Sequence, residues 1–143
     1  MLSPEQIADA ANRLYRAEND QTQIRALTMS FDLDMDDAYA IQKAWIDRRL
    51  GDGEKVIGYK IGLTSRTMQV AMNITTPDYG VLTDAMLFAD QCEITAADFL
   101  DPRIESEFAF VMKKRLFGED VSIEEVMDAT EYVQPALELI SAR

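Results

Sequence analysis

The sequence contains no histidine. This absence excludes Ser-His-Asp and Cys-His catalysis and most zinc and iron sites, because each of these depends on an imidazole side chain. Any chemistry must therefore use Asp, Glu, Lys, Arg, Tyr or Ser, or a hard metal ion. Cysteine is almost absent as well, since Cys92 is the single one and cannot form an internal disulfide. With no histidine to activate its thiol, we expect Cys92 to be an ordinary buried or strand-edge residue.

Basic residues are scarce: 14 lysines and arginines stand against 26 acidic residues, for a formal net charge of −12. A charge of this sign opposes binding to nucleic acid and to anionic lipid, so we expect neither partner. No apolar run is long enough to span a bilayer, and the first residues lack the pattern of a signal peptide. These features predict a cytoplasmic protein. Its 143 residues, 48% of them hydrophobic, fit one globular domain.

Two helices are predicted in the first third of the chain. Ser3-Pro4-Glu5-Gln6 is typical of a helix start, with Ser3 as the cap, and it is followed by an apolar stripe of Ile7, Ala11 and Leu14. The second helix is expected to run from after Asp34 to Gly51. Its predicted buried face carries Ala38, Ile41 and Trp45.

The remainder of the chain mixes strands and short helices. Alternating apolar residues predict strands over 56–63, 81–88 and 103–113, with a short helix over 65–72 and a turn over 75–80. Both faces of the 103–113 strand become apolar, so we expect it to be buried. Ser122-Ile123-Glu124-Glu125 predicts a helix to about residue 131, and 134–140 is an extended apolar run. This order predicts an α+β fold, with an N-terminal helical region over 1–54 and the first part of a catalytic domain over 55–143.

Three glutamates are candidates for a metal site. Glu105 and Glu107 lie two residues apart on one face of their predicted strand, so both carboxylates can reach one ion. The alternative is a solvated strand end, because a chance Glu-x-Glu is common in so acidic a chain. Glu138 lies within an apolar run, where a buried charge needs a partner, although an edge strand facing water explains it equally well. Three carboxylates without histidine would suit Mg²⁺ or Mn²⁺.

Lys60 and Asp78 are candidates for proton transfer. Gly58 and Gly62, two residues before and after Lys60, leave space on its face of the strand, where a lysine can meet a small anion. A surface lysine with its charged end in solvent is the alternative. Asp78 follows Pro77, and its side chain is as consistent with stabilising a turn as with chemistry.

Four motifs in order resemble one family. They are Gly58-Tyr59-Lys60-Ile61-Gly62-Leu63-Thr64-Ser65, Thr76-Pro77-Asp78-Tyr79-Gly80, Pro102-Arg103-Ile104-Glu105-Ser106-Glu107 and Pro135-Ala136-Leu137-Glu138. Together they are similar to the hydratase and decarboxylase branch of the fumarylacetoacetate hydrolase superfamily, in register along nearly the whole chain. Members of this branch are longer. The resemblance therefore implies that this chain is the N-terminal half of a mixed β-roll whose C-terminal half is absent.

The resemblance also implies roles for the candidate residues. Glu105, Glu107 and Glu138 would bind Mg²⁺ or Mn²⁺, Lys60 would be a catalytic acid or base, and Asp78 would assist proton transfer. The implied activity is that of a metal-dependent hydratase in aromatic compound degradation, which adds water to a 2-oxo or 2-hydroxy alkenoic acid such as 2-oxo-hept-4-ene-1,7-dioate or 2-hydroxypenta-2,4-dienoate. The alternative reaction is decarboxylation of a vinylogous 2-oxo diacid. The alternative from another class is a catalytically silent interaction module.

The partners implied by the resemblance are a small 2-oxo acid substrate and further copies of the chain. The protein would be a homo-oligomer that can associate with a decarboxylase of the same pathway.

Overall fold

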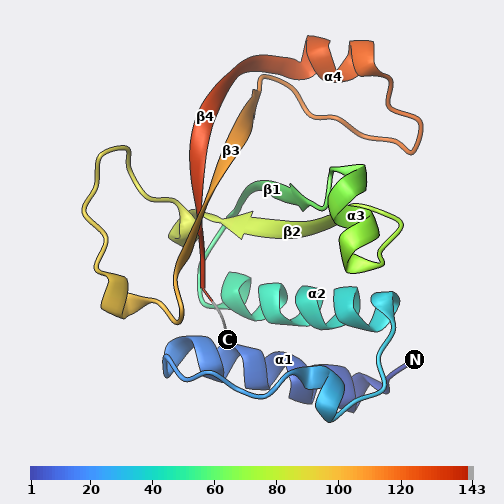
Figure 1. The fold of residues 1–143 in the computed structure, drawn as a ribbon, viewed down its shortest axis with the longest axis vertical. Coiled ribbons are helices and arrows are strands. Elements are labelled where there is room, and N and C mark those ends of the chain that lie inside the picture. Colours follow the sequence, from blue (N-terminus) through green and yellow to red (C-terminus); the bar gives the residue numbers. More distant parts are fainter. Residues whose placement is uncertain (142–143) are drawn as a thin grey trace. The chain divides into compact units, whose positions relative to one another are not determined.

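The computed structural model describes residues 1–141, which form two compact units (Figure 1). The first unit is Met1–Asp98 and holds three α-helices and a two-stranded antiparallel sheet. The second begins at Phe99 and holds a second two-stranded antiparallel sheet and one helix. Helices that alternate with antiparallel strands confirm the predicted α+β class.

Helices α1 (Pro4–Asn19) and α2 (Met35–Gly51) pack against each other in the first unit. Both start at capping boxes, as predicted for Ser3 with Gln6, and Asp34 and Asp37 form the second box. The core between them is built from Ala10, Ala11, Ile41, Trp45 and Ile46.

The predicted buried face of α2 was wrong at one position. Ala38 is exposed, whereas Asp37 is only 1% exposed, so the buried stripe runs at four-residue spacing through Asp37, Ile41 and Trp45. The Asp37 carboxylate turns inward because it accepts hydrogen bonds from the backbone N–H of Leu2, at 2.6 Å, and of Asp34, at 3.3 Å. A buried carboxylate is tolerated where such donors satisfy it.

A charged network joins α2 to the following hairpin. Arg49 is buried and donates to carboxylate oxygens of Glu18, at 2.6 Å, and Glu54, at 2.9 Å. Burial alone would lower the pKa of Arg49, but the hydrogen bonds and charges of Glu18 and Glu54 outweigh it and raise that pKa. Glu54 also accepts from the hydroxyl of Thr83 at 2.5 Å, so the base of the hairpin is fixed to the helix.

The hairpin consists of β1 (Val56–Gly62) and β2 (Asp78–Thr83), which pair antiparallel, with α3 (Arg66–Met72) in the connection between them. α2 lies between α1 and this hairpin (Figure 1). β1 and α3 agree with the predicted elements, although β1 ends before Leu63, whose φ of 52° is left-handed.

β2 starts three residues earlier than predicted and ends before Phe88. Asp78, Tyr79 and Gly80 pair with β1 and therefore belong to the strand instead of the expected turn. At the other end, Asp84 opens a 3₁₀ turn over Asp84–Met86, and its carboxylate accepts from the N–H groups of Lys55 and Ala85.

The second unit is a long antiparallel ribbon of β3 (Arg103–Met112) and β4 (Thr130–Ile140), with α4 (Ile123–Ala129) at one end (Figure 1). The predicted strand at 103–113 and the extended run at 134–140 are confirmed. The helix opened by Ser122 is confirmed too, but it ends at Ala129 because Thr130 already belongs to β4.

The prediction that β3 is buried was wrong. One face of the ribbon is apolar and exposed to solvent, and its exposed fractions reach 76% at Phe108 and 73% at Leu137. A two-stranded ribbon covers neither of its own faces, so apolar alternation alone does not bury a strand unless another layer packs on it. The expectation for Cys92 was wrong as well, since it lies exposed outside the strands.

Two further predictions concern membrane-spanning segments and the boundary at residue 54. Within residues 1–141, none of the helices has the length and apolar character needed to cross a membrane. The compact units divide after Asp98, whereas the helices give way to strands between Gly51 and Val56, near the predicted boundary at residue 54. The division into a helical region and a catalytic domain stays a prediction.

Candidate functional site

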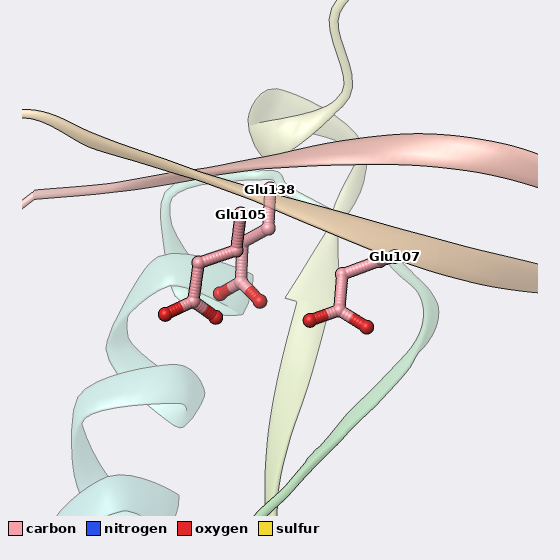
Figure 2. A group of neighbouring side chains, drawn as sticks. All are labelled: Glu105, Glu107 and Glu138. Carbon is pink, nitrogen blue, oxygen red and sulfur yellow. The ribbon is translucent and has the colours of Figure 1, made fainter.

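The three predicted metal ligands come together on one face of the β3–β4 ribbon (Figure 2). Glu105 of β3 lies directly opposite Glu138 of β4 in the strand register. Glu107 follows two residues later on the same face of β3. One carboxylate oxygen from each glutamate can be chosen so that all three lie within 4.8 Å of one another.

The ribbon itself explains this convergence. Residues paired across an antiparallel sheet project from the same face, and residues two apart along a strand do so as well. Ala136 lies opposite Glu107, so a small side chain leaves space at the fourth corner of the cluster. Glu138 is half-buried, whereas Glu105 and Glu107 are exposed.

The arrangement is chemically suited to a cation. Like charges placed directly opposite each other across a sheet destabilise it, and a shared cation would reverse that effect. The donors are oxygen atoms only, which favours Mg²⁺, Ca²⁺ or Mn²⁺ over zinc or copper. Three carboxylates also leave coordination positions for water or for a chelating substrate.

Lys60 and Asp78 share one face of the β1–β2 hairpin in the first unit. In the register, Lys60 is opposite Gly80 and Asp78 is opposite Gly62, so each polar side chain stands across from a glycine. Lys60 and Asp78 are therefore diagonal neighbours. Both are half-buried, whereas Tyr59 and Ile61 on the other face of β1 are 66% and 64% exposed.

Two side chains of α2 hold the strand that carries Asp78. The ring of Tyr39 stacks on the ring of Tyr79, with centroids 4.7 Å apart and planes at 13°. The backbone N–H of Tyr79 donates to the Tyr39 hydroxyl at 3.4 Å, and its carbonyl accepts from Nε2 of Gln42 at 3.1 Å. Both backbone groups of Tyr79 are bonded to side chains of α2, which restrains the backbone next to Asp78.

The structure thus groups the predicted site residues into two sets. Glu105, Glu107 and Glu138 belong to the second unit, and Lys60 and Asp78 belong to the first. The roles assigned to all five stay predictions.

Sequence reasoning missed three residues around Asp78. Tyr39 and Gln42 are three residues apart and hence on one face of α2, but nothing in their spacing identifies β2 as the partner. Gly80 was interpreted only as a turn residue, whereas it lies in β2 opposite Lys60.

Comparison with known proteins finds hydratases and a decarboxylase. The chain is 46% identical over 134 residues to 2-oxo-hept-4-ene-1,7-dioate hydratase of Escherichia coli, and this match covers 93% of the chain and 50% of that protein. It is 39% identical over 143 residues to 2-keto-4-pentenoate hydratase of Paraburkholderia xenovorans, of which 53% is covered. No protein-family model matches the chain.

Solved structures give the same result. The chain superposes on 4-oxalocrotonate decarboxylase from Pseudomonas putida G7, complexed with magnesium and adipate, with a TM-score of 0.93 and 32% identity. This match covers 99% of the chain and 54% of the decarboxylase. The same enzyme complexed with calcium and acetate superposes equally well.

These matches confirm the resemblance to the hydratase and decarboxylase branch of the fumarylacetoacetate hydrolase superfamily. The chain spans about half the length of the hydratases and of the decarboxylase described above.

Proposed function

We propose that this protein is a divalent-metal-dependent hydratase, a hydro-lyase that adds water to a 2-oxo or 2-hydroxy alkenoic acid in the degradation of aromatic compounds. The observation that carries the proposal is the convergence of Glu105, Glu107 and Glu138 on one face of the ribbon. The names of the hydratase relatives support the reaction, and the magnesium and calcium complexes of the structural neighbour support a divalent metal.

Glu105, Glu107 and Glu138 would hold Mg²⁺ or Mn²⁺. When bound, the ion supplies positive charge that polarises the 2-oxo group and the adjacent carboxylate of the substrate. The antiparallel register holds the backbones of Glu105 and Glu138 opposite each other. Carboxylates that share one sheet face need little rearrangement to bind, which favours both affinity and a defined substrate orientation.

Lys60 and Asp78 would transfer the protons that hydration requires. Addition of water across a carbon–carbon double bond places a hydroxyl on one carbon and a proton on the other. The attacking water must therefore lose a proton while carbon gains one. An amine and a carboxyl group that share one sheet face are two groups able to donate or accept the protons of this exchange.

Decarboxylation of a vinylogous 2-oxo diacid is the second candidate. It is favoured by the TM-score of 0.93 to 4-oxalocrotonate decarboxylase and by 34% identity to a decarboxylase of the same name from a Pseudomonas strain. Both reactions benefit from the same electrophilic stabilisation at the 2-oxo group, so the metal ligands do not distinguish them.

The remaining features of the proposal concern the protein's environment. The substrate is a small 2-oxo acid, and nucleic acid and membrane are not partners. The protein acts in the cytoplasm as a homo-oligomer and associates with a decarboxylase of the same pathway.

The proposal is tested by product analysis of the protein at its natural full length, with Mg²⁺ or Mn²⁺ present. Incubation with 2-hydroxypenta-2,4-dienoate and with 2-oxo-hept-4-ene-1,7-dioate should give the hydrated 2-oxo acids without loss of CO₂. Release of CO₂ from 4-oxalocrotonate in place of hydration would favour the decarboxylase. If none of these three substrates is turned over with metal present and the protein binds no metal, a catalytically silent interaction module is the better interpretation.

A further inference from the structure

The hairpin face that carries Lys60 and Asp78 also carries Gly58, Gly62 and Gly80. Its glycines are not equivalent, as shown by what a methyl group would meet at each of them. At Gly62 a Cβ atom would overlap Oδ1 of Asp78 and lie 3.3 Å from its Cγ. At Gly80 it would lie 3.0 Å from Cγ and 3.3 Å from Cδ of Lys60. At Gly58 it would meet nothing within 4 Å.

This pattern corrects the interpretation of the glycines around Lys60. Gly58 and Gly62 were expected to clear space for Lys60 itself. In the structure, the lysine stem lies across Gly80 on the partner strand, and the space at Gly62 is taken by the carboxylate of Asp78. Gly62 and Gly80 thus each make room for the polar side chain opposite, whereas Gly58 contacts neither of these side chains.

We propose that Gly62 and Gly80 are positioning residues, Gly62 for the carboxylate of Asp78 and Gly80 for the stem of Lys60. The catalytic consequence rests on the proposed function, in which these two side chains transfer protons.

The backbone of Asp78 is held, so its side chain must respond to any added methyl group. Asp78 is paired to Gly62 in the sheet, and the next residue, Tyr79, is bound through its N–H and C=O to Tyr39 and Gln42. The strand therefore cannot easily move away from a new side chain at position 62. The carboxylate can, because rotation about its own bonds costs less than breaking the sheet.

Gly62 and Gly80 do not need glycine for their backbone conformation. Neither Gly62 nor Gly80 has a φ in the left-handed region, so an alanine fits the backbone of both. Gly58 also accepts alanine, lies on the same strand and face as Gly62, and is the matched control.

The test compares Gly62→Ala, Gly80→Ala and Gly58→Ala in the full-length protein with Mg²⁺ present. A displaced reactive group can cost on the order of 100-fold in rate, so we expect kcat of Gly62→Ala to fall by about that factor with little change in KM. Gly80→Ala should lose less, because the flexible lysine stem needs to move only a few tenths of an ångström. Gly58→Ala should stay within about twofold of the wild type. A Gly62→Ala variant with the kcat of Gly58→Ala would overturn the inference.

A thermal double-mutant cycle tests the placement without using activity. Gly62→Ala should lower Tm while Asp78 is present, and it should have no more effect than Gly58→Ala once Asp78→Ala has removed the carboxylate. Additive effects at positions 62 and 78 would refute the assigned contact. If the wild type turns over none of the substrates, the proposed function fails, and the cycle still decides whether Gly62 positions Asp78.

Discussion

Glu105 and Glu138 face each other as a directly opposed pair across an antiparallel ribbon, although they are 33 positions apart in the sequence. A positive charge near both carboxylates stabilises such a pair of like charges. The third carboxylate, that of Glu107, lies on the same face and adds to the negative charge. The cluster therefore has an energetic reason to bind a cation, and this reason leads to the first prediction.

Replacing any one of the three glutamates with Gln should weaken Mn²⁺ binding while the fold is retained. Loss of an outer hydrogen-bond partner of a metal ligand costs about 10- to 100-fold in affinity, and loss of a ligand charge should cost at least as much. Metal at about 100 times its Kd should stabilise the wild type by about 2.7 kcal/mol, and the variants much less at the same concentration. Titration calorimetry and thermal melts measure both quantities.

Glu131→Gln is the matched control, because Glu131 is an exposed residue of β4 outside the cluster. The affinity of this variant for Mn²⁺ should equal that of the wild type. Unchanged Mn²⁺ affinity in all three cluster variants would refute the metal site.

Lys60→Ala should lower turnover far more than metal affinity. Lys60 is on the hairpin and is not among the oxygen ligands, so its removal takes away a proton-transfer group and leaves the metal donors intact. General acid–base groups typically contribute about 10²- to 10⁴-fold to rate, and the loss in kcat should fall in that range. Steady-state kinetics with Mg²⁺ and calorimetry with Mn²⁺ separate the two effects. Normal turnover in this variant would show that Lys60 is a surface lysine without a catalytic role.

The isolated 143-residue chain should self-associate or melt without cooperativity. The apolar face of the β3–β4 ribbon is exposed at Ile104, Phe108, Phe110, Val133 and Leu137. Exposed apolar strands of this kind associate with one another in water. Sedimentation velocity should show oligomers that diminish in a Phe108→Thr, Leu137→Thr double variant. Val111→Thr, on the opposite face of β3, serves as the control, and a monomer with a sharp reversible melt would contradict the prediction.

The pairing of α1 with α2 should weaken in acid through Asp37. The backbone N–H of Leu2 holds the pKa of Asp37 below its usual value, and the Asp34 N–H and the N-terminal amine act in the same direction against the opposing effect of burial. A lowered folded-state pKa means that ionised Asp37 stabilises the fold above the pKa of the unfolded chain. That contribution is lost as the pH falls through the lowered pKa that Asp37 has in the folded protein.

Thermal melts from neutral to acidic pH should therefore show a decline in Tm that is smaller in Asp37→Asn. Asp36→Asn, an exposed neighbour in the same helical turn, should keep the wild-type profile. Identical pH profiles in the wild type and Asp37→Asn would show that this buried carboxylate does not contribute to acid sensitivity.

Most helices and strands could be predicted from local sequence because their signals are local. Capping at Ser3 and Ser122 is decided by hydrogen bonds within four residues, and alternation marks β1 and β3 over a few residues. The error at Asp78 occurred because pairing between residues far apart in the sequence determines the structure there. Asp78 was placed in a turn because Pro77 and Gly80 suggest one, and its pairing with Gly62 depends on a partner 16 residues away.

The sequence by itself determined the chemical composition of the candidate site: no histidine, oxygen ligands only, and the order of motifs that carries the resemblance to the hydratases. Only the tertiary structure decided that Glu138 lies opposite Glu105, that β3 has an exposed apolar face, and that the glycine beside Asp78 is Gly62. The physical reason is that residue type fixes which interactions a side chain can make. Strand register and layer packing, which depend on the whole chain, fix which of those interactions are made.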